Sequence, residues 1–183
     1  MNKDIKEVLY TPDQIKARVA EMGAALTKDY AGVVARGEQI VLVSVLRGAC
    51  IFMADLAREI DLPLEMDFMA VSSYGNAAKS SGEVKIVKDL SSSIKGKHVI
   101  IAEDILDTGL TLHYLKKTLL SRSPASIEVV TLLRKRTATQ EDIACKLVGF
   151  ECPDEFIVGY GLDYSERYRN LPYIGILQPE VYR

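Results

Sequence analysis

The chain has 183 residues and a net charge of −2, with 48% hydrophobic and 26% charged residues. This length suits one domain with a substantial core, so we expect a single domain over residues 1–183. The slightly acidic balance argues against a nucleic-acid partner, and no apolar run approaches the ~20 residues of a membrane span. Cys50, Cys145 and Cys152 form no CxxC pair and no signal peptide is visible, so we expect a cytoplasmic protein.

The first half of the chain predicts a long helix followed by alternating strands and a second helix. Thr11 suits a helix N-cap and Pro12 the first helical position, and apolar residues then recur at helical spacing as far as Val33. Gly37 is a suitable end for this helix. The continuous apolar run 40–46 is typical of a strand buried on both faces. We further expect a helix at 51–57, a strand at 64–73, a polar loop at 75–82 and a strand at 83–90 that closes this loop as a hairpin.

The second half continues the alternation of strands and helices. We expect a strand at 98–102, a helix at 110–120, a strand at 127–133 and short strands at 146–150, 156–160 and 173–177. This order predicts an α/β fold with a doubly wound, mostly parallel central sheet. Ligands of such sheets bind beyond the carboxyl ends of the strands. The segments at these ends are 46–48, 72–75, 103–111 and 134–136.

Two adjacent carboxylates, Glu103 and Asp104, directly follow the predicted strand 98–102. Such a pair is costly at the end of a buried strand unless it meets a cation or hydroxyl groups. Carboxylate oxygens suit Mg²⁺, and neighbouring carboxylates can also accept hydrogen bonds from the two hydroxyls of a ribose. The alternative is that both acids are solvated.

A turn rich in hydroxyl groups, residues 107–111, leads from this acidic pair into the predicted helix 110–120. Backbone N–H groups at a helix N-terminus bind phosphate, Gly109 allows a close backbone approach, and Thr108 and Thr111 offer hydroxyl donors. Asp-Thr-Gly by itself is better explained as a capping turn. The whole segment 99–112, however, offers groups for a cation, a ribose diol and a phosphate, and therefore suits a phosphorylated ribose.

The segment VIIAEDILDTGLTL, residues 99–112, resembles the phosphoribosyl-pyrophosphate-binding motif of the type I phosphoribosyltransferases. Leu46-Arg47-Gly48 is similar to the pyrophosphate loop of that family, and Ser73-Tyr74-Gly75 is similar to the start of its flexible catalytic loop. The similarity covers nearly the whole chain. Matches to the hypoxanthine–guanine branch are Lys135, the stretch 156–160, Leu162-Asp163-Tyr164 and Arg169.

The resemblance implies purine salvage, with transfer of the 5-phosphoribosyl group from phosphoribosyl pyrophosphate to hypoxanthine and also guanine. The products are then IMP or GMP and pyrophosphate. The resemblance further implies Mg²⁺ as cofactor, a homodimer or homotetramer, and a cis peptide bond between Leu46 and Arg47. It implies a core over about 36–150 and a small hood formed by the N-terminal segment and about 151–183.

The resemblance also assigns roles to individual residues. Asp107 is the candidate general base, placed near N7 of the purine. Glu103, Asp104 and Asp163 are the candidate Mg²⁺ ligands. The residues expected to bind phosphoribosyl pyrophosphate are Leu46, Arg47, Gly48, Ser73, Tyr74, Glu103, Asp104, Asp107, Thr108, Gly109, Leu110, Thr111 and Arg169.

The purine pocket is expected to contain Lys135, Phe156, Ile157 and Asp163. A lysine ammonium only donates hydrogen bonds, so Lys135 suits the O6 acceptor of hypoxanthine or guanine and mismatches adenine. The alternatives are a solvated charge for Lys135 and a core aromatic for Phe156, which otherwise can stack on the purine. The loop 74–82 is expected to close over the transition state and exclude water, although its composition also fits a plain surface loop.

Other functions remain open at this point. A nucleotide-sensing, RNA-binding regulator of the same fold would need a basic face, which the acidic balance disfavours. Enzymes for adenine, orotate or uracil are disfavoured by Lys135, which does not rank hypoxanthine, guanine and xanthine, so a xanthine-preferring enzyme is a further alternative. Dehydrogenases and P-loop nucleotide hydrolases are poor candidates because their glycine-rich motifs are missing.

Overall fold

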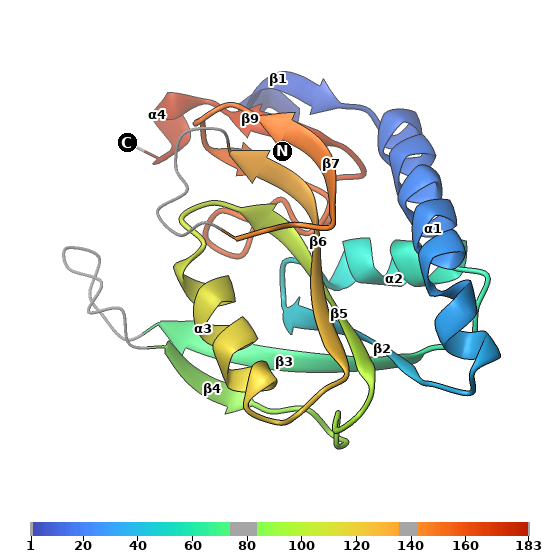
Figure 1. Ribbon diagram of the computed structural model, residues 1–183. Coiled ribbons are helices and arrows are strands. Elements are labelled where there is room, and N and C mark those ends of the chain that lie inside the picture. The colour runs from blue at the N-terminus through green and yellow to red at the C-terminus, as the bar shows by residue number, and fades with distance from the viewer. Residues whose placement is uncertain (1, 74–83, 136–142, 183) are drawn as a thin grey trace.

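The computed structural model describes residues 2–73, 84–135 and 143–182. In this part of the chain a six-stranded sheet has the order β4-β3-β2-β5-β6-β7 (Figure 1). Its neighbouring strands run parallel except for the antiparallel pair β3 and β4. The expected α/β fold with a mostly parallel central sheet is confirmed. The strands are β2 (Ile40–Leu46), β3 (Glu65–Ser73), β4 (Val84–Lys88), β5 (His98–Leu106), β6 (Ser126–Lys135) and β7 (Leu147–Cys152).

Helices cover both faces of this sheet (Figure 1). α1 (Pro12–Ala35) and α2 (Cys50–Glu59) pack on one face, and α3 (Leu110–Leu120) packs on the other. Successive side chains of β2 point to opposite faces of the sheet, because side chains alternate along a strand. Leu42 belongs to the core cluster under α1 and α2, and Val43 belongs to the cluster under α3. The continuous apolar run of β2 is therefore buried on both faces, as predicted.

The start of α1 has the hydrogen bonds that its sequence predicts. The Thr11 side chain accepts from the backbone N–H of Gln14 at 3.3 Å, and the Gln14 side chain accepts from the N–H of Thr11 at 2.9 Å. This reciprocal capping satisfies two donors that the first helical turn leaves without partners. At the other end, Gly37 takes a left-handed conformation with φ of 77°, which glycine adopts at low cost.

A smaller antiparallel sheet joins the two ends of the chain in the order β1-β9-β8. β1 (Ile5–Tyr10) pairs with β9 (Ile174–Leu177), and β9 pairs with β8 (Ile157–Val158). β1 escaped the sequence analysis because none of its side chains is fully buried and they do not alternate between polar and apolar. A short 3₁₀ helix (Asn2–Asp4) and helix α4 (Pro179–Tyr182) flank this sheet.

Several predicted boundaries differ from those observed. β5 continues to Leu106 rather than ending at 102, because its pairing with β6 continues through Glu103 and Ile105. β6 likewise extends to Lys135 and β7 to Cys152. β8 has two residues, not the predicted five, because the backbone turns to positive φ just after it, at Gly159 and Tyr160.

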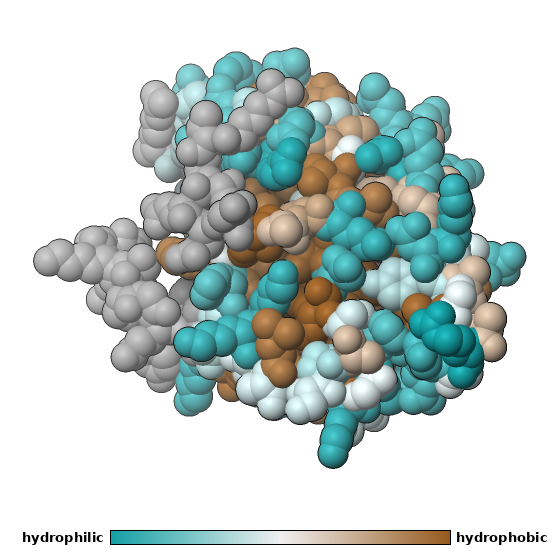
Figure 2. Space-filling view, in the orientation of Figure 1, coloured by the Kyte–Doolittle hydropathy of each residue, from teal (hydrophilic) through white to brown (hydrophobic). Residues whose placement is uncertain are grey.

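The strand order reverses at β2 and β5, which pair in parallel, so their carboxyl ends lie side by side. From β2 the chain moves outward to β3 and β4, and then returns to the other side of β2 with β5. Ligands of open α/β sheets bind at such a reversal. In the orientation of Figure 1, apolar side chains gather near the middle of the visible face, with hydrophilic ones around them (Figure 2). No helix in the described residues is both long and apolar enough to cross a membrane.

Candidate functional site

The ends of β2 and β5 meet through a contact between Gly48 and Asp104. A Cβ atom placed on Gly48 would lie 1.7 Å from Oδ2 of Asp104, so only glycine leaves room for this carboxylate. The peptide bond between Leu46 and Arg47 is cis, in agreement with the expectation for this loop. The segment 46–48 and the acidic pair, far apart in sequence, therefore form one site.

The two carboxylates of this site are held in a partly buried position. Burial raises the pKa of Glu103 well above its usual range, and the charge of Asp104 raises it further. Burial also raises the pKa of Asp104, to about 6, against the opposing effect of backbone hydrogen bonds and the Arg169 guanidinium. Neighbouring carboxylates that lack a cation resist ionisation in this way, and a divalent cation would relieve the cost.

The carboxylates of Glu103 and Asp104 fit a Mg²⁺ ion whose remaining ligands come from outside the protein. Within residues 2–73, 84–135 and 143–182, no group of three or more potential protein ligands is close enough to hold a metal ion alone. Mg²⁺ commonly binds through one or two carboxylates and completes its coordination with substrate oxygens and water. The pair therefore suits an ion that arrives with a polyphosphate substrate. Asp163 lies near enough to raise the pKa of Asp104, and its place in the metal site stays a prediction.

The segment after β8 forms one wall of the site. A Cβ on Gly161 would lie 2.1 Å from the carbonyl oxygen of Gly48, so these two backbones are in close contact. Arg169 donates from Nη1 to the carbonyl oxygen of Gly161 at 2.7 Å, and its Nη2 lies 2.8 Å from Oδ1 of Asp163. The Nε of Arg169 is buried and lacks a hydrogen-bond partner among the described residues. Arg169 is thus held in place, and its Nε–H is a donor that no described residue accepts.

Glu166 is a member of the site that the sequence analysis did not single out. Its Oε2 accepts from Nη1 of Arg47 at 2.6 Å and lies 3.7 Å from Nη2 of Arg169. Its backbone N–H donates to Oδ2 of Asp163 at 2.9 Å. A carboxylate between two guanidinium groups marks a place that suits an anion.

The N-terminus of α3 is open in the described part of the chain. Gly109 is the N-cap residue with φ of 81°, and no described side chain caps this end. The first backbone N–H groups of α3, from Leu110 and Thr111 onward, therefore retain their capacity for an anion. Asp107 does not cap the helix, because its carboxylate faces Lys135 instead.

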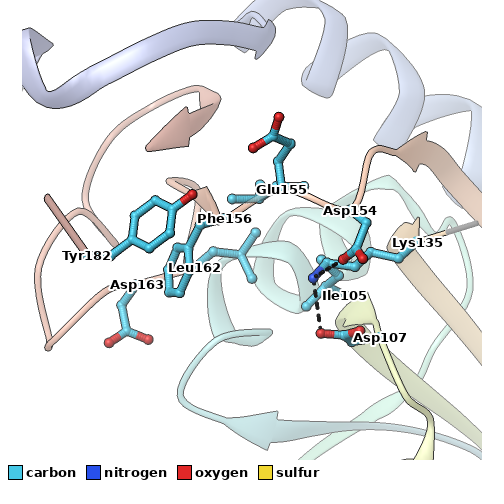
Figure 3. Close-up of a pocket in the computed structure, with 10 residues that line it drawn as sticks. Ile105, Asp107, Lys135, Asp154, Glu155, Phe156, Leu162, Asp163 and Tyr182 are labelled. Carbon is cyan, nitrogen blue, oxygen red and sulfur yellow. Dashed lines mark hydrogen bonds and ion pairs between the residues drawn. The ribbon is translucent and has the colours of Figure 1, made fainter. Parts of the chain in front are cut away.

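A cavity of about 450 Å³ adjoins the strand ends (Figure 3). The Nζ atom of Lys135 lies 3.2 Å from Oδ2 of Asp107 and 3.3 Å from Oδ1 of Asp154. Burial acts to lower the pKa of Lys135, but the two carboxylates outweigh it and raise this pKa. The side chain of Lys135 is only 15% exposed, so the solvated-charge alternative for this residue is wrong. The lining consists of Ile105, Asp107, Lys135, Asp154, Glu155, Phe156, Ile157, Leu162, Asp163 and Tyr182.

Aromatic rings form one side of this cavity. Phe156 is 36% exposed, so it is not a core residue. Its ring centroid lies 5.0 Å from that of Tyr182 and 5.2 Å from that of Tyr164. Ile157, which was also predicted for the pocket, lines it from β8.

The structure thus brings most of the predicted residues to one edge of the sheet. Ser73 is the last residue of β3, while Tyr74 and the loop 74–82 lie outside the described residues. Asp154, Glu155 and Tyr182 line the cavity but were missed. Asp154 follows the true end of β7 at Cys152, so a correct strand end would have pointed to it.

Comparisons with known proteins show to which family this chain is similar. Residues 10–165 match the phosphoribosyl transferase domain. The chain is 53% identical over 182 residues to the hypoxanthine-guanine phosphoribosyltransferase of Bacillus subtilis, covering 100% of this chain and 98% of that protein. A crystal structure of a hypoxanthine phosphoribosyltransferase from Staphylococcus aureus superposes with a TM-score of 0.93 at 53% identity, covering 100% and 97% of the two chains. The Trypanosoma cruzi hypoxanthine phosphoribosyltransferase in complex with its product IMP superposes with a TM-score of 0.91 at 40% identity, covering 98% of each chain.

Proposed function

The chain belongs to the phosphoribosyl transferase family, and we propose from this premise that the site at the ends of β2 and β5 makes purine nucleotides. The enzyme transfers the 5-phosphoribosyl group of phosphoribosyl pyrophosphate to hypoxanthine or guanine, giving IMP or GMP and pyrophosphate. A ring nitrogen of the base forms a bond to C1 of the ribose. The bond from C1 to the pyrophosphate oxygen breaks, and the base loses a proton.

The contact of Gly48 with Asp104 is the observation that carries this proposal, because it joins an anion loop to a carboxylate pair. Glu103 and Asp104 would hold the ribose hydroxyls and the Mg²⁺ ion, which would neutralise charge on the leaving group. Arg47, Arg169 and the backbone around Gly48 stabilise the negative charge that develops on pyrophosphate. The uncapped N-terminus of α3, with Thr108 and Thr111, binds the 5′-phosphate.

The cavity around Lys135 receives the base. Lys135 donates to O6, Phe156 lies along the ring, and Asp107 takes the proton from the purine. Asp163 completes the site beside Asp104. The three cysteines are free, which supports a reducing compartment such as the cytoplasm, and we retain the homodimer or homotetramer as the proposed assembly.

An assay with each base in turn tests this function. With phosphoribosyl pyrophosphate and Mg²⁺, kcat/KM should be high for hypoxanthine and guanine and lower by orders of magnitude for adenine; xanthine should be measured beside them. Lys135→Ala should lower kcat/KM for hypoxanthine by about 10- to 100-fold, since a hydrogen bond from a charged donor is lost. Lys28→Ala, on the exposed surface of α1, is the matched control. Equal use of adenine, or an unchanged Lys135→Ala enzyme, would contradict the assignment.

A further inference from the structure

Asp154 lies in the connection between β7 and β8, at the rim of the cavity that contains Lys135 (Figure 3). Its Oδ1 lies 3.3 Å from Nζ of Lys135, on a side chain that is 63% exposed. The side chain of Lys135 is only 15% exposed, so most of it is withdrawn from water and its ammonium group points into the cavity. The position of this group therefore depends on the protein groups around it.

The ammonium of Lys135 has more donors than its two carboxylate partners require. An ammonium group carries three N–H donors in tetrahedral directions. Asp107 on the β5 side and Asp154 on the β7 side can each take one, at 3.2 and 3.3 Å. With two directions fixed by carboxylates on different elements, the direction of the third is determined.

We propose that Asp154 is a positioning residue that, together with Asp107, directs the third N–H of Lys135 to the carbonyl oxygen of the purine base. This inference rests on the proposed function and extends it to a residue outside the reacting groups. With Asp107 as the sole counter-ion, the ammonium could turn about one contact and its remaining donors would lack a fixed direction. Asp154 also pairs with Lys135. Asp107, the carboxylate proposed to take the purine proton, is therefore not the only partner of this lysine.

The protonation of Lys135 depends on the same arrangement. Burial lowers its pKa while the carboxylates of Asp107 and Asp154 raise it. Other ionisable groups near Lys135 are Cys152 on β7, which pairs with it in the sheet, and the cavity-lining side chains of Glu155, Asp163 and Tyr182. Burial raises the pKa of the Cys152 thiol to about 11, so it stays neutral near pH 7. Loss of the Asp154 charge therefore lowers the pKa of Lys135, and it also removes one of the charges that raise the pKa of Cys152.

Steady-state kinetics of Asp154→Ala and Asp154→Asn test the proposal. We expect Asp154→Ala to raise KM for hypoxanthine by roughly twofold to fivefold, the upper range for a partly exposed ion pair, with kcat and KM for phosphoribosyl pyrophosphate little changed. Asp154→Asn keeps an acceptor oxygen and should show a smaller rise. The inhibition constant of unsubstituted purine, which lacks O6, should not change in either variant.

A pH profile separates positioning from a merely structural role. The pKa of the Lys135 ammonium, followed by NMR of the labelled lysine side chain in the free enzyme, should be lower in both variants, because neutral lysine forms earlier once a carboxylate is lost. This titration is made without substrate, so ionisation of the base does not enter it. Asp29→Ala is the matched control, since it removes a carboxylate 3.1 Å from the Nζ of another lysine, Lys146.

Each outcome decides the question. An unchanged KM for hypoxanthine together with an unchanged pKa of Lys135 in Asp154→Ala would overturn the proposal. So would a parallel loss of kcat, of affinity for phosphoribosyl pyrophosphate and of thermal stability in both variants, because this pattern indicates general damage. Failure of the wild-type enzyme to make IMP would instead refute the proposed function. The wild-type assay distinguishes this outcome from the two outcomes that concern the variants.

Discussion

Gly48→Ala tests the contact on which the proposed site depends. The new Cβ would lie 1.7 Å from Oδ2 and 2.8 Å from Cγ of Asp104, whereas real Cβ contacts are essentially never below 3.0 Å. The carboxylate must therefore retreat by about 1.3 Å, or the loop must move by a similar amount. Misplacement of a reacting or positioning group by ~1 Å can cost ~100-fold in rate.

We expect Gly48→Ala to lower kcat/KM for phosphoribosyl pyrophosphate by about 100-fold and to raise the Mg²⁺ concentration needed for half-maximal rate. The cost in stability should be smaller, about 1–3 kcal/mol, as for other overpacked sites. Initial rates over both concentrations, together with thermal unfolding, measure these effects.

Gly32→Ala is the matched control for this substitution. Gly32 is exposed within α1, and the nearest atom to its added Cβ is 3.5 Å away. This variant should keep full activity and gain about 0.5–1 kcal/mol in unfolding free energy, because alanine favours a helix over glycine. The reasoning is refuted if folded Gly48→Ala retains kcat/KM for phosphoribosyl pyrophosphate within about threefold of wild type.

Three further substitutions test other parts of the molecule. Asp107→Asn should lower kcat by about 100-fold or more while KM for phosphoribosyl pyrophosphate stays near its wild-type value, because a general base contributes to turnover; near-normal kcat would remove Asp107 from this role. Glu166→Gln should lower KM for phosphoribosyl pyrophosphate by up to about fivefold by releasing Arg47 from an exposed ion pair, and a raised KM in initial-rate assays would count against competition at this place. Thr11→Ala should cost about 1 kcal/mol of unfolding free energy and lower Tm by about 2–4 °C in a thermal melt without effect on kcat, and an unchanged Tm would show that the cap contributes nothing.

Local patterns in the sequence predicted most of the central sheet. The apolar run of β2 and the capping residues of α1 act over a few neighbouring positions, so their outcome can be read directly from the chain. The bounds of α3 were predicted to the residue, because Gly109 precedes a clear helical pattern. β1 was missed because its partner β9 lies at the opposite end of the chain, and its polar and apolar residues show no periodic pattern.

Some features of the candidate site were likewise predicted from local sequence, and others depend on contacts between distant segments. The segment 99–112 by itself indicated a phosphorylated ribose with a cation, because the chemistry of its side chains is local. The contacts of Gly48 with Asp104, of Arg47 with Glu166 and of Lys135 with Asp154 were not predictable. Each joins segments that are brought together only by the strand order and by where each strand ends.

The sequence alone therefore predicted the fold class and a phosphorylated ribose as the ligand. The fold class follows from periodicity, and the ligand follows from the side-chain types at strand ends. The tertiary structure decided which carboxylate faces which cation. That choice depends on the reversal of strand order between β2 and β5 and on the extension of β7 to Cys152. Pairing across the sheet sets these distances, and no pattern within a single segment contains them.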